Sequence, residues 1–440
     1  MVSSSNEQID VQHVAELSAE TLDWRHQAIP AAFHGRTVDE FLAAEPHLGN
    51  LQTPVLTLDE AAMAHNLQLL ASWCKRHSVL LAPHGKTTMA PALWKRQLEL
   101  GAWGLTLANA HQLRTARAFG VQRIMIANSV TDPQAIAYLA AETAKGAQII
   151  SWVDSVRTVR LLERELATTP QIVLPVIVEL GALNGRTGAR ANTEALEIAR
   201  SVAASPQLAL AGVGGYEGSL AHTTDEVALG AVRGYLRRVG ELHRSALDEK
   251  LYGTDEVIIT AGGSAYFDEV ASELSELSQE ATDQVPAVQV VLRSGAYVIH
   301  DDGFYRMISP LGRQDPEAPE ALRSAMHAWV RVVSQPEPGL AILDAGKRDL
   351  PFDEGLPVPQ AVGTGLGREM TALESAAITA VNDQHAFLSF DPSLKINPGD
   401  VVRLGLSHPC TALDKWTLLP VLDTAANSNP RIVDAVRTFF

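Results

Sequence analysis

Two short segments, far apart in the sequence, carry residue types that could do chemistry. The first, residues 81–91, has Lys86 at its centre, between an apolar run of strand length at 79–82 and a stretch at 92–100 with helical apolar spacing. A lysine just past a strand of a parallel α/β fold stands where reacting groups collect. Near apolar groups it can lose its proton and form a Schiff base with an aldehyde cofactor. The alternative is a surface lysine in a turn.

The second segment contains His408 and Cys410, two residues apart. On an extended chain their side chains would point to the same face and could both coordinate one metal ion. Imidazole plus thiolate suits Zn²⁺, and two protein ligands would leave positions open for water or substrate. The alternative is a buried cysteine beside a histidine in a loop.

Glycine-rich turns follow three of the later apolar runs. Gly262, Gly263 and Ser264 come directly after the run at 257–259, and residues 293–297 follow the next one. Glycine lets backbone N–H groups approach a phosphate, and phosphate sites of (β/α)8 barrels often lie after the late strands. Residues 212–218 form a further glycine-rich strand end. Each turn alone is also explained as a tight turn without a ligand.

Composition bounds the class of protein. The chain has 440 residues, 46% hydrophobic content and a formal net charge of −16. It can fill a large core and is expected to hold two domains, and its charge argues against a nucleic-acid partner. Two cysteines form no disulfide framework, the N-terminus has no signal-peptide pattern and no apolar run could span a membrane. We therefore expect a cytoplasmic protein with no membrane partner.

The chain order indicates an α/β fold, a (β/α)8 TIM-type barrel followed by a C-terminal mainly-β domain. Residues 1–50 have helical spacing and are expected to form an extension, 51–320 the barrel and 321–440 the β domain. After an entry strand at 55–58, eight strands are predicted with helices between them, at residues 80–82, 104–107, 123–127, 149–153, 173–178, 211–216, 257–261 and 289–293.

These motifs together resemble a known family. Pro83-His-Gly-Lys86-Thr, the segment 179–188, the Thr260-Ala-Gly-Gly-Ser264 turn and His408-Pro-Cys410 look like those of the D-serine dehydratase and D-threonine aldolase family. That family belongs to the fold-type III, alanine-racemase-like pyridoxal-phosphate enzymes. The similarity runs from about residue 53 to residue 416, and the pairing of the two distant motifs is more specific than either alone.

The resemblance implies roles residue by residue. Lys86 matches the lysine that holds pyridoxal 5'-phosphate and later serves as the base at Cα. His84 belongs to the same cofactor motif, Arg186 matches an arginine against the cofactor ring, and Tyr216 an aromatic of the cofactor pocket. Gly262, Gly263 and Ser264 match the phosphate-binding turn, and Tyr297 lies close by in the next turn. His408 and Cys410 match the two metal ligands.

Three positions depart from the family's pattern. Gly181 stands where an aspartate is usual, Gly218 stands where a Tyr-x-His sequence would place histidine, and residues 108–111 replace a Glu-Ala pair. These departures bear on the substrate more than on the cofactor. An aspartate is common at the position of Cys410 in the aldolase branch, so the cysteine favours the dehydratase branch.

The resemblance thus implies a metal-dependent lyase, a D-amino acid dehydratase acting on a substrate such as D-serine, with Zn²⁺, Mn²⁺ or Mg²⁺ as the metal and a homodimer as the assembly. One alternative is an aldolase that gives glycine and an aldehyde, and another is a non-catalytic cofactor-binding protein. A third is a racemase, whose reaction would not use the metal ligands His408 and Cys410. A metallohydrolase using His408 and Cys410 is a further alternative; it would be colourless and indifferent to carbonyl reagents.

Overall fold

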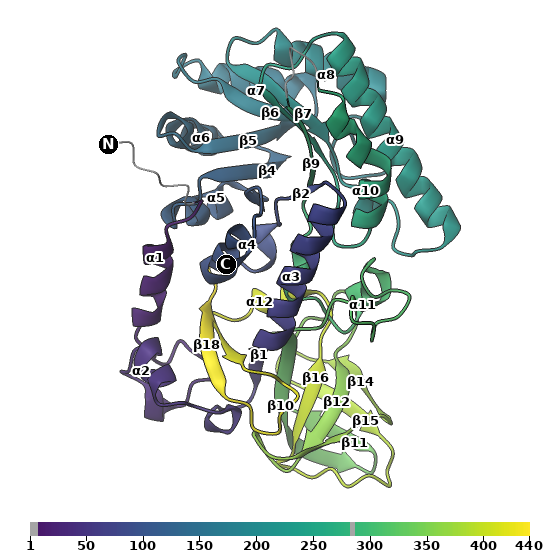
Figure 1. Ribbon diagram of the computed structural model, residues 1–440. Coiled ribbons are helices and arrows are strands. Elements are labelled where there is room, and N and C mark those ends of the chain that lie inside the picture. Colours follow the sequence, from purple (N-terminus) through teal and green to yellow (C-terminus); the bar gives the residue numbers. More distant parts are fainter. Residues whose placement is uncertain (1–7, 282–286) are drawn as a thin grey trace. The chain divides into compact units, whose positions relative to one another are not determined.

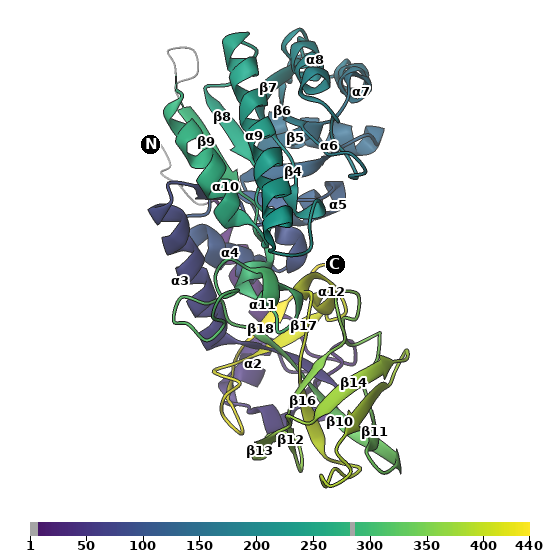
Figure 2. The ribbon, with the colours of Figure 1, turned by 90° about the vertical axis from the view of Figure 1, so that its right-hand side faces the viewer.

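The computed structural model describes residues 8–281 and 287–440, which form two compact units (Figures 1 and 2). The described part of the first unit comprises 8–10, Leu70–Lys86 and Gln97–Gly295. The second comprises Val11–Leu69, Thr87–Arg96 and Ala296–Phe440. Each unit draws on several segments of the chain, whereas the domains expected from sequence are contiguous.

The first unit is built on an eight-stranded parallel sheet that curls into a barrel. The strands follow the order β2-β9-β8-β7-β6-β5-β4-β3. A parallel bridge between His84 and Thr106 joins the two ends of this order. The predicted barrel is therefore confirmed, with strands β2 (Leu80–Leu81), β3 (Leu105–Leu107), β4 (Arg123–Ser129), β5 (Gln148–Val153), β6 (Leu174–Glu179), β7 (Leu208–Gly214), β8 (Glu256–Thr260) and β9 (Ala287–Leu292).

Helices alternate with these strands, and short polar side chains cap the first turns of α5, α6, α7 and α9. Asp132 accepts the backbone N–H of Ala135 at the start of α6, where Pro133 is the first helical residue. Asp225 caps α9 in the same way. The helices are α5 (Ala110–Ala118), α6 (Pro133–Ala144), α7 (Val156–Leu166), α8 (Asn192–Ala203), α9 (Glu226–Asp248) and α10 (Phe267–Leu274). No helix in the described ranges is both long and apolar enough to cross a membrane.

The interior of the barrel is filled by large side chains from strands on all sides. Trp152 on β5 is 2% exposed and packs with Met125 of β4 and Ile177 of β6. This packing makes the barrel a solid core rather than a channel. Consequently, the reacting groups must lie at the ends of the strands. The full cluster is Ala82, Trp103, Met125, Trp152, Ile177, Ile258 and Val291.

The second unit is built on a mostly antiparallel sheet of order β13-β12-β16-β10-β1-β17-β18, with β11, β14 and β15 attached through β10. The predicted mainly-β architecture is thus confirmed. Its strands are β1 (Val55–Asp59), β10 (Met326–Glu337), β11 (Leu340–Leu343), β12 (Val358–Gly363), β13 (Met370–Ala372), β14 (Ala376–Val381), β15 (Ala386–Phe390), β16 (Val401–Gly405), β17 (Leu418–Leu422) and β18 (Ile432–Arg437).

Strand β1 corrects one detail of the sequence analysis, which took it as the strand that opens the barrel. It lies antiparallel to β10 and parallel to β17 in the sheet of the second unit. The indole Nε1 of Trp329 donates to the buried Oγ1 of Thr57 at 2.9 Å and fixes the pairing with β10. An apolar run predicts a strand, but the partner strand is chosen by contacts distant in sequence.

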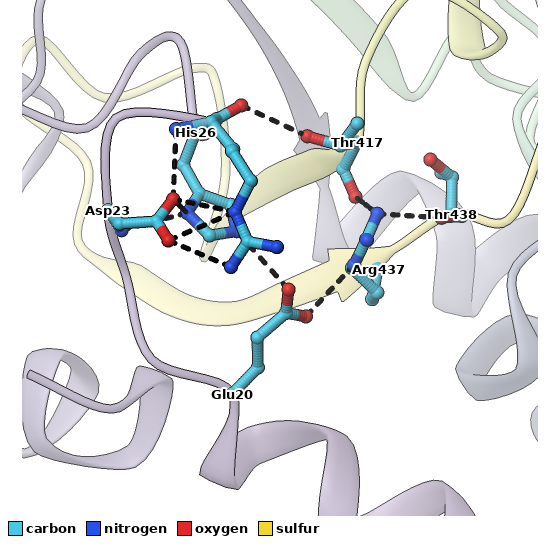
Figure 3. A network of polar contacts seen from close by, with 7 residues as sticks. Glu20, Asp23, His26, Thr417, Arg437 and Thr438 are labelled. Carbon is cyan, nitrogen blue, oxygen red and sulfur yellow. Dashed lines mark hydrogen bonds and ion pairs between the residues drawn. The ribbon is translucent and has the colours of Figure 1, made fainter.

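The N-terminal segment is held to the last strands of the second unit by a polar network (Figure 3). Arg437 Nε donates to Glu20 at 2.9 Å, and its Nη1 donates to the carbonyls of Thr417 and Thr438. His26 lies within 3.5 Å of the carboxylate of Glu20. The expected helices of this segment are α1 (Val11–Ala15) and α2 (Val38–Ala43). The segment therefore packs on the β sheet of the second unit.

Further helices belong to the described parts of the two units. Helices α3 (Glu60–Arg76) and α4 (Pro91–Glu99) each contribute residues to both units. The short helix α11 (Phe304–Ile308) belongs to the second unit.

Candidate active site

Lys86 lies in a short 3-10 turn, η4 (Gly85–Thr87), directly after strand β2 of the barrel. Its side chain is exposed and makes no hydrogen bond or ion pair with any residue that the structure describes. The amine is thus accessible, as covalent chemistry on Nζ requires.

His84 presents a neutral polar ring at the same strand end. Its Nδ1 is buried and has no hydrogen-bond partner within the described ranges. Burial lowers the pKa of His84 well below 6.5, and the positive charges of Lys86, Arg293 and Arg186 act in the same direction. Because all three cations act on one imidazole, they lie at the same end of the barrel. A buried ring nitrogen without a partner fits a polar ligand held there.

Arg186 and Tyr216 line a cavity at this end of the barrel, together with the loop that follows β6. The guanidinium of Arg186 lies over the Tyr216 ring, 5.6 Å from its centroid. Tyr216 is 39% exposed, so its ring is accessible to a ligand. The two residues that the sequence placed in one cofactor pocket therefore do lie together.

Glu179, at the end of β6, contributes a buried carboxylate to the same cavity. Its Oε1 accepts a hydrogen bond from Thr187 at 2.7 Å, and its Oε2 is buried without a partner in the described part of the chain. Burial raises the pKa of Glu179, and the hydrogen bond from Thr187 lowers it by less. The unsatisfied oxygen is a second polar position that a ligand could use.

The loop after β6 also explains the glycine at position 181. A Cβ on Gly181 would lie 2.2 Å from the backbone oxygen of Thr187 and 2.4 Å from Nη1 of Arg190. The loop closes against this position, so the aspartate of the family pattern has no room here. At Gly218 a Cβ would meet the hydroxyl of Tyr216 at 2.5 Å, so a histidine there would displace that ring.

The turn after β8 holds Gly262, Gly263 and Ser264. The first two glycine N–H groups, expected to bind phosphate, donate to the carboxylate of Glu217 at 2.8 and 2.7 Å. Ser264 makes no hydrogen bond with a described residue. Of the three residues, only Ser264 therefore has its backbone N–H and hydroxyl available for another acceptor.

The remaining predicted residues belong to the second unit. Tyr297 is buried in the turn η7 (Ala296–Val298). His408 immediately precedes α12 (Pro409–Leu413), which includes Cys410, and His408 has a left-handed backbone with φ of 56°. The extended conformation assumed for this pair is wrong, because Pro409 at the first helical position favours a helix start. The two side chains still meet through a hydrogen bond.

Two aspartates hold His408 in place. Nδ1 of His408 lies 2.6 Å from Oδ2 of Asp353, and the other carboxylate oxygen accepts from the Thr411 hydroxyl at 2.7 Å. The buried carboxylate of Asp301 accepts the backbone N–H of His408 at 3.0 Å. Burial opposes protonation of His408, but hydrogen bonds with Cys410 and Asp353 outweigh it and raise its pKa to about 9.

The donor set fits a divalent metal held by two protein ligands. No group of three or more His, Cys, Asp or Glu side chains in residues 8–281 and 287–440 is arranged around one metal position. With Nδ1 facing Asp353, His408 presents Nε2 for coordination, and a carboxylate behind a histidine ligand is the usual arrangement in metalloproteins. Cys410 Sγ donates to the hydroxyl of Thr87 at 3.4 Å, also within the second unit.

Four residues described above had no role in the sequence analysis: Glu179, Glu217 and Arg293 of the first unit, and Asp353 of the second. Glu179 is the last residue of β6, and Glu217 and Arg293 follow β7 and β9, a placement that could have marked them. Asp353 lies in a loop without a motif, 55 residues before His408, and had no comparable signal.

The chain is similar in sequence to known proteins. Residues 58–265 match the family model "Alanine racemase, N-terminal domain", and residues 325–422 match "Putative serine dehydratase domain". A D-threonine aldolase of Arthrobacter sp is 27% identical over 362 residues, which are 82% of this chain and 86% of that protein. A 3-hydroxy-D-aspartate aldolase of Paracoccus denitrificans (strain Pd 1222) is 26% identical over 331 residues, 74% of this chain and 80% of the relative.

Two solved structures share the fold. The D-threonine aldolase from Filomicrobium marinum superposes with a TM-score of 0.73 at 24% identity, covering 90% of this chain and 97% of that chain. The D-threo-3-hydroxyaspartate dehydratase from Delftia sp. HT23 gives a TM-score of 0.69 at 19% identity, covering 90% and 99%.

Proposed function

Because this chain belongs to the fold-type III D-serine dehydratase/D-threonine aldolase family, a family of pyridoxal-phosphate-dependent enzymes, we propose that it is a metal-dependent lyase. It would convert a β-hydroxy D-amino acid such as D-serine to a 2-oxo acid and ammonia. One observation carries the proposal. Thr87, the residue after Lys86, contacts Cys410, 323 positions later in the chain, inside the second unit.

The residues of the barrel end have the chemistry that this function needs. Pyridoxal phosphate, when bound, supplies a conjugated ring that spreads negative charge developing at Cα. Lys86 would bind it through Nζ and, once released, accept the Cα proton on the same atom. Arg186 would bring a cation to the ring, and His84, neutral because of its lowered pKa, would offer a hydrogen bond rather than a charge.

The residues of the second unit would hold the metal. His408 through Nε2 and Cys410 through Sγ would bind it, and Asp353 would keep the imidazole oriented. The metal would polarise the β-hydroxyl of the substrate and make it a better leaving group. Zn²⁺ suits an imidazole and a thiolate, and Mn²⁺ and Mg²⁺ are the alternatives.

A second candidate is an aldolase that cleaves the Cα–Cβ bond and releases glycine. It is favoured by the two aldolases that match most of this chain. Removing a proton from the β-hydroxyl, instead of expelling the hydroxyl, would redirect the same site to this outcome. Cys410 favours elimination, because the aldolase branch tends to carry an aspartate at this position.

A parallel assay decides between the two candidates. The purified protein is loaded with pyridoxal phosphate and Zn²⁺ or Mn²⁺ and given D-serine, D-threonine and D-threo-3-hydroxyaspartate, while 2-oxo acid, ammonia and glycine are followed. The proposal expects 2-oxo acid and ammonia, lost in Lys86→Ala and in Cys410→Ala. Cys74→Ala, which changes the buried cysteine of α3, is the matched control and should stay active.

Other results would redirect the proposal. Glycine with an aldehyde would assign the aldolase reaction. Cofactor binding without any product would favour a non-catalytic cofactor-binding protein. We also propose a homodimer, as is usual for enzymes of this fold type, which sedimentation equilibrium of the loaded protein would test.

A further inference from the structure

The turn after β8 is an anion site that the chain fills with its own carboxylate. Glu217, in the short turn η5 (Glu217–Ser219) after β7, is 0% exposed. Its two oxygens accept one N–H each, from Gly262 at 2.8 Å and from Gly263 at 2.7 Å. Two parallel bonds from consecutive amides to one carboxylate form a bidentate contact, which fixes direction as well as distance.

The surroundings show that this contact is built into the fold. The guanidinium of Arg293 is buried, and its interaction with Glu217 opposes the lowering of its pKa that burial causes. Arg293 donates to Oγ1 of Thr260 and to the carbonyl of Gly215, each at 2.6 Å. The carboxylate therefore interacts electrostatically with a buried cation, which offsets part of the cost of burying its charge.

The conformation and close packing of this turn favour glycine at both positions. Gly262 has φ of 92°, and a Cβ on Gly263 would lie 2.8 Å from the Tyr216 ring. The hydroxyl of Ser294 donates to the carbonyl of Gly263 at 2.8 Å, which ties this turn to the one after β9. Glu217 and Ser294 thus hold opposite sides of one peptide segment.

We propose that Glu217 is a positioning residue for the phosphate of the cofactor. Glu217 accepts the N–H groups of Gly262 and Gly263, so these two donors are not available to the phosphate. The phosphate is bound instead by the backbone N–H and the hydroxyl of Ser264. This inference rests on the proposed function, since it takes pyridoxal phosphate as the ligand. It also revises the phosphate turn expected from sequence, in which both glycines were to be ligands.

The test compares pyridoxal phosphate with pyridoxal, which lacks the phosphate but has the same aldehyde. Binding of each to the full-length protein is titrated by absorbance, without substrate. In Glu217→Gln one oxygen is replaced by an NH₂ group that faces an N–H. We expect about tenfold weaker binding of pyridoxal phosphate, because the turn that presents Ser264 to the phosphate is held less firmly, and unchanged binding of pyridoxal.

Two further variants complete the experiment. Ser264→Ala should weaken pyridoxal phosphate binding in the same selective way and tests the assignment if Glu217→Gln does not fold. Glu142→Gln removes a carboxylate that is also buried, on α6, and should leave both affinities unchanged.

The proposal is overturned if Glu217→Gln binds pyridoxal phosphate more tightly, because the carboxylate would then compete with the phosphate for the glycine N–H groups. It is also overturned if both ligands lose affinity equally, or if Ser264→Ala has no effect. Failure of the unaltered protein to bind either ligand would instead refute the proposed function on which this inference rests.

Discussion

Removing the carboxylate of Asp353 should weaken metal binding without removing a metal ligand. Asp353 Oδ2 lies 2.6 Å from Nδ1 of His408, and its other oxygen accepts from Thr411 at 2.7 Å. Without this carboxylate the imidazole of His408 can rotate about its side-chain bonds, and its Nε2 donates its electron pair to the metal less well. The imidazole would then have to be fixed in one orientation when the metal binds, which reduces the affinity for the metal.

The size of the effect follows from the geometry. A hydrogen bond to a charged partner contributes about 1.5–3 kcal/mol, and loss of such a carboxylate behind a histidine ligand typically costs about 10–100-fold in metal affinity. These ranges agree, because tenfold corresponds to about 1.4 kcal/mol. Asp353→Asn keeps an acceptor oxygen and should lie near the lower limit, whereas Asp353→Ala should lie near the upper limit.

The measurement is a titration of the purified variants with Zn²⁺ by calorimetry and with Co²⁺ by absorbance, which reports the thiolate of Cys410 directly. Thr411→Val, which removes the hydroxyl that donates to Asp353 and to the backbone carbonyl of His408, should lose less affinity than Asp353→Asn. Asp414→Asn is the matched control, because its side chain has the same 41% exposure as Asp353. Unchanged affinity in a folded Asp353→Ala protein would refute the positioning role of Asp353.

Three further predictions concern stability. Burial lowers the pKa of His243 to about 4 in the folded protein. The unfolded chain therefore binds more protons than the folded protein below pH 6.5. The free energy of unfolding should fall by about 3 kcal/mol as the pH falls from 6.5 to 4. Urea melts at several pH values should show this loss reduced in His243→Gln; an identical pH dependence would exclude His243 as its source. Gly181→Ala places a Cβ against the carbonyl of Thr187 and should destabilise the protein by about 1–3 kcal/mol, measured by the same melts, whereas an unchanged midpoint would show that the loop adjusts freely. Asp225→Ala removes the cap of α9 and should cost about 1 kcal/mol, and a stability equal to that of the unaltered protein would mean that other groups satisfy the first turn.

The sequence was sufficient for the architecture of the barrel, because its signals are local. Eight apolar runs of strand length, separated by helical stretches, correspond to β2 through β9. The place of Lys86 just after the first of them needed only the alternation of strand and helix. The family was likewise indicated by motifs, since the cofactor and metal motifs are short and each keeps its residues adjacent.

What only the tertiary structure decided are the contacts between residues distant in sequence. Strand β1 pairs with β10 and β17, although its own residues would suit a barrel strand equally well. Asp353 reaches His408 across 55 positions, and Glu217 reaches Gly262 across 45. The sequence predicted a glycine turn able to bind an anion, but not which anion binds its N–H groups. Periodicity and turn preference act over a few neighbouring residues, whereas the partner of a buried polar group is chosen by the packing of the whole chain.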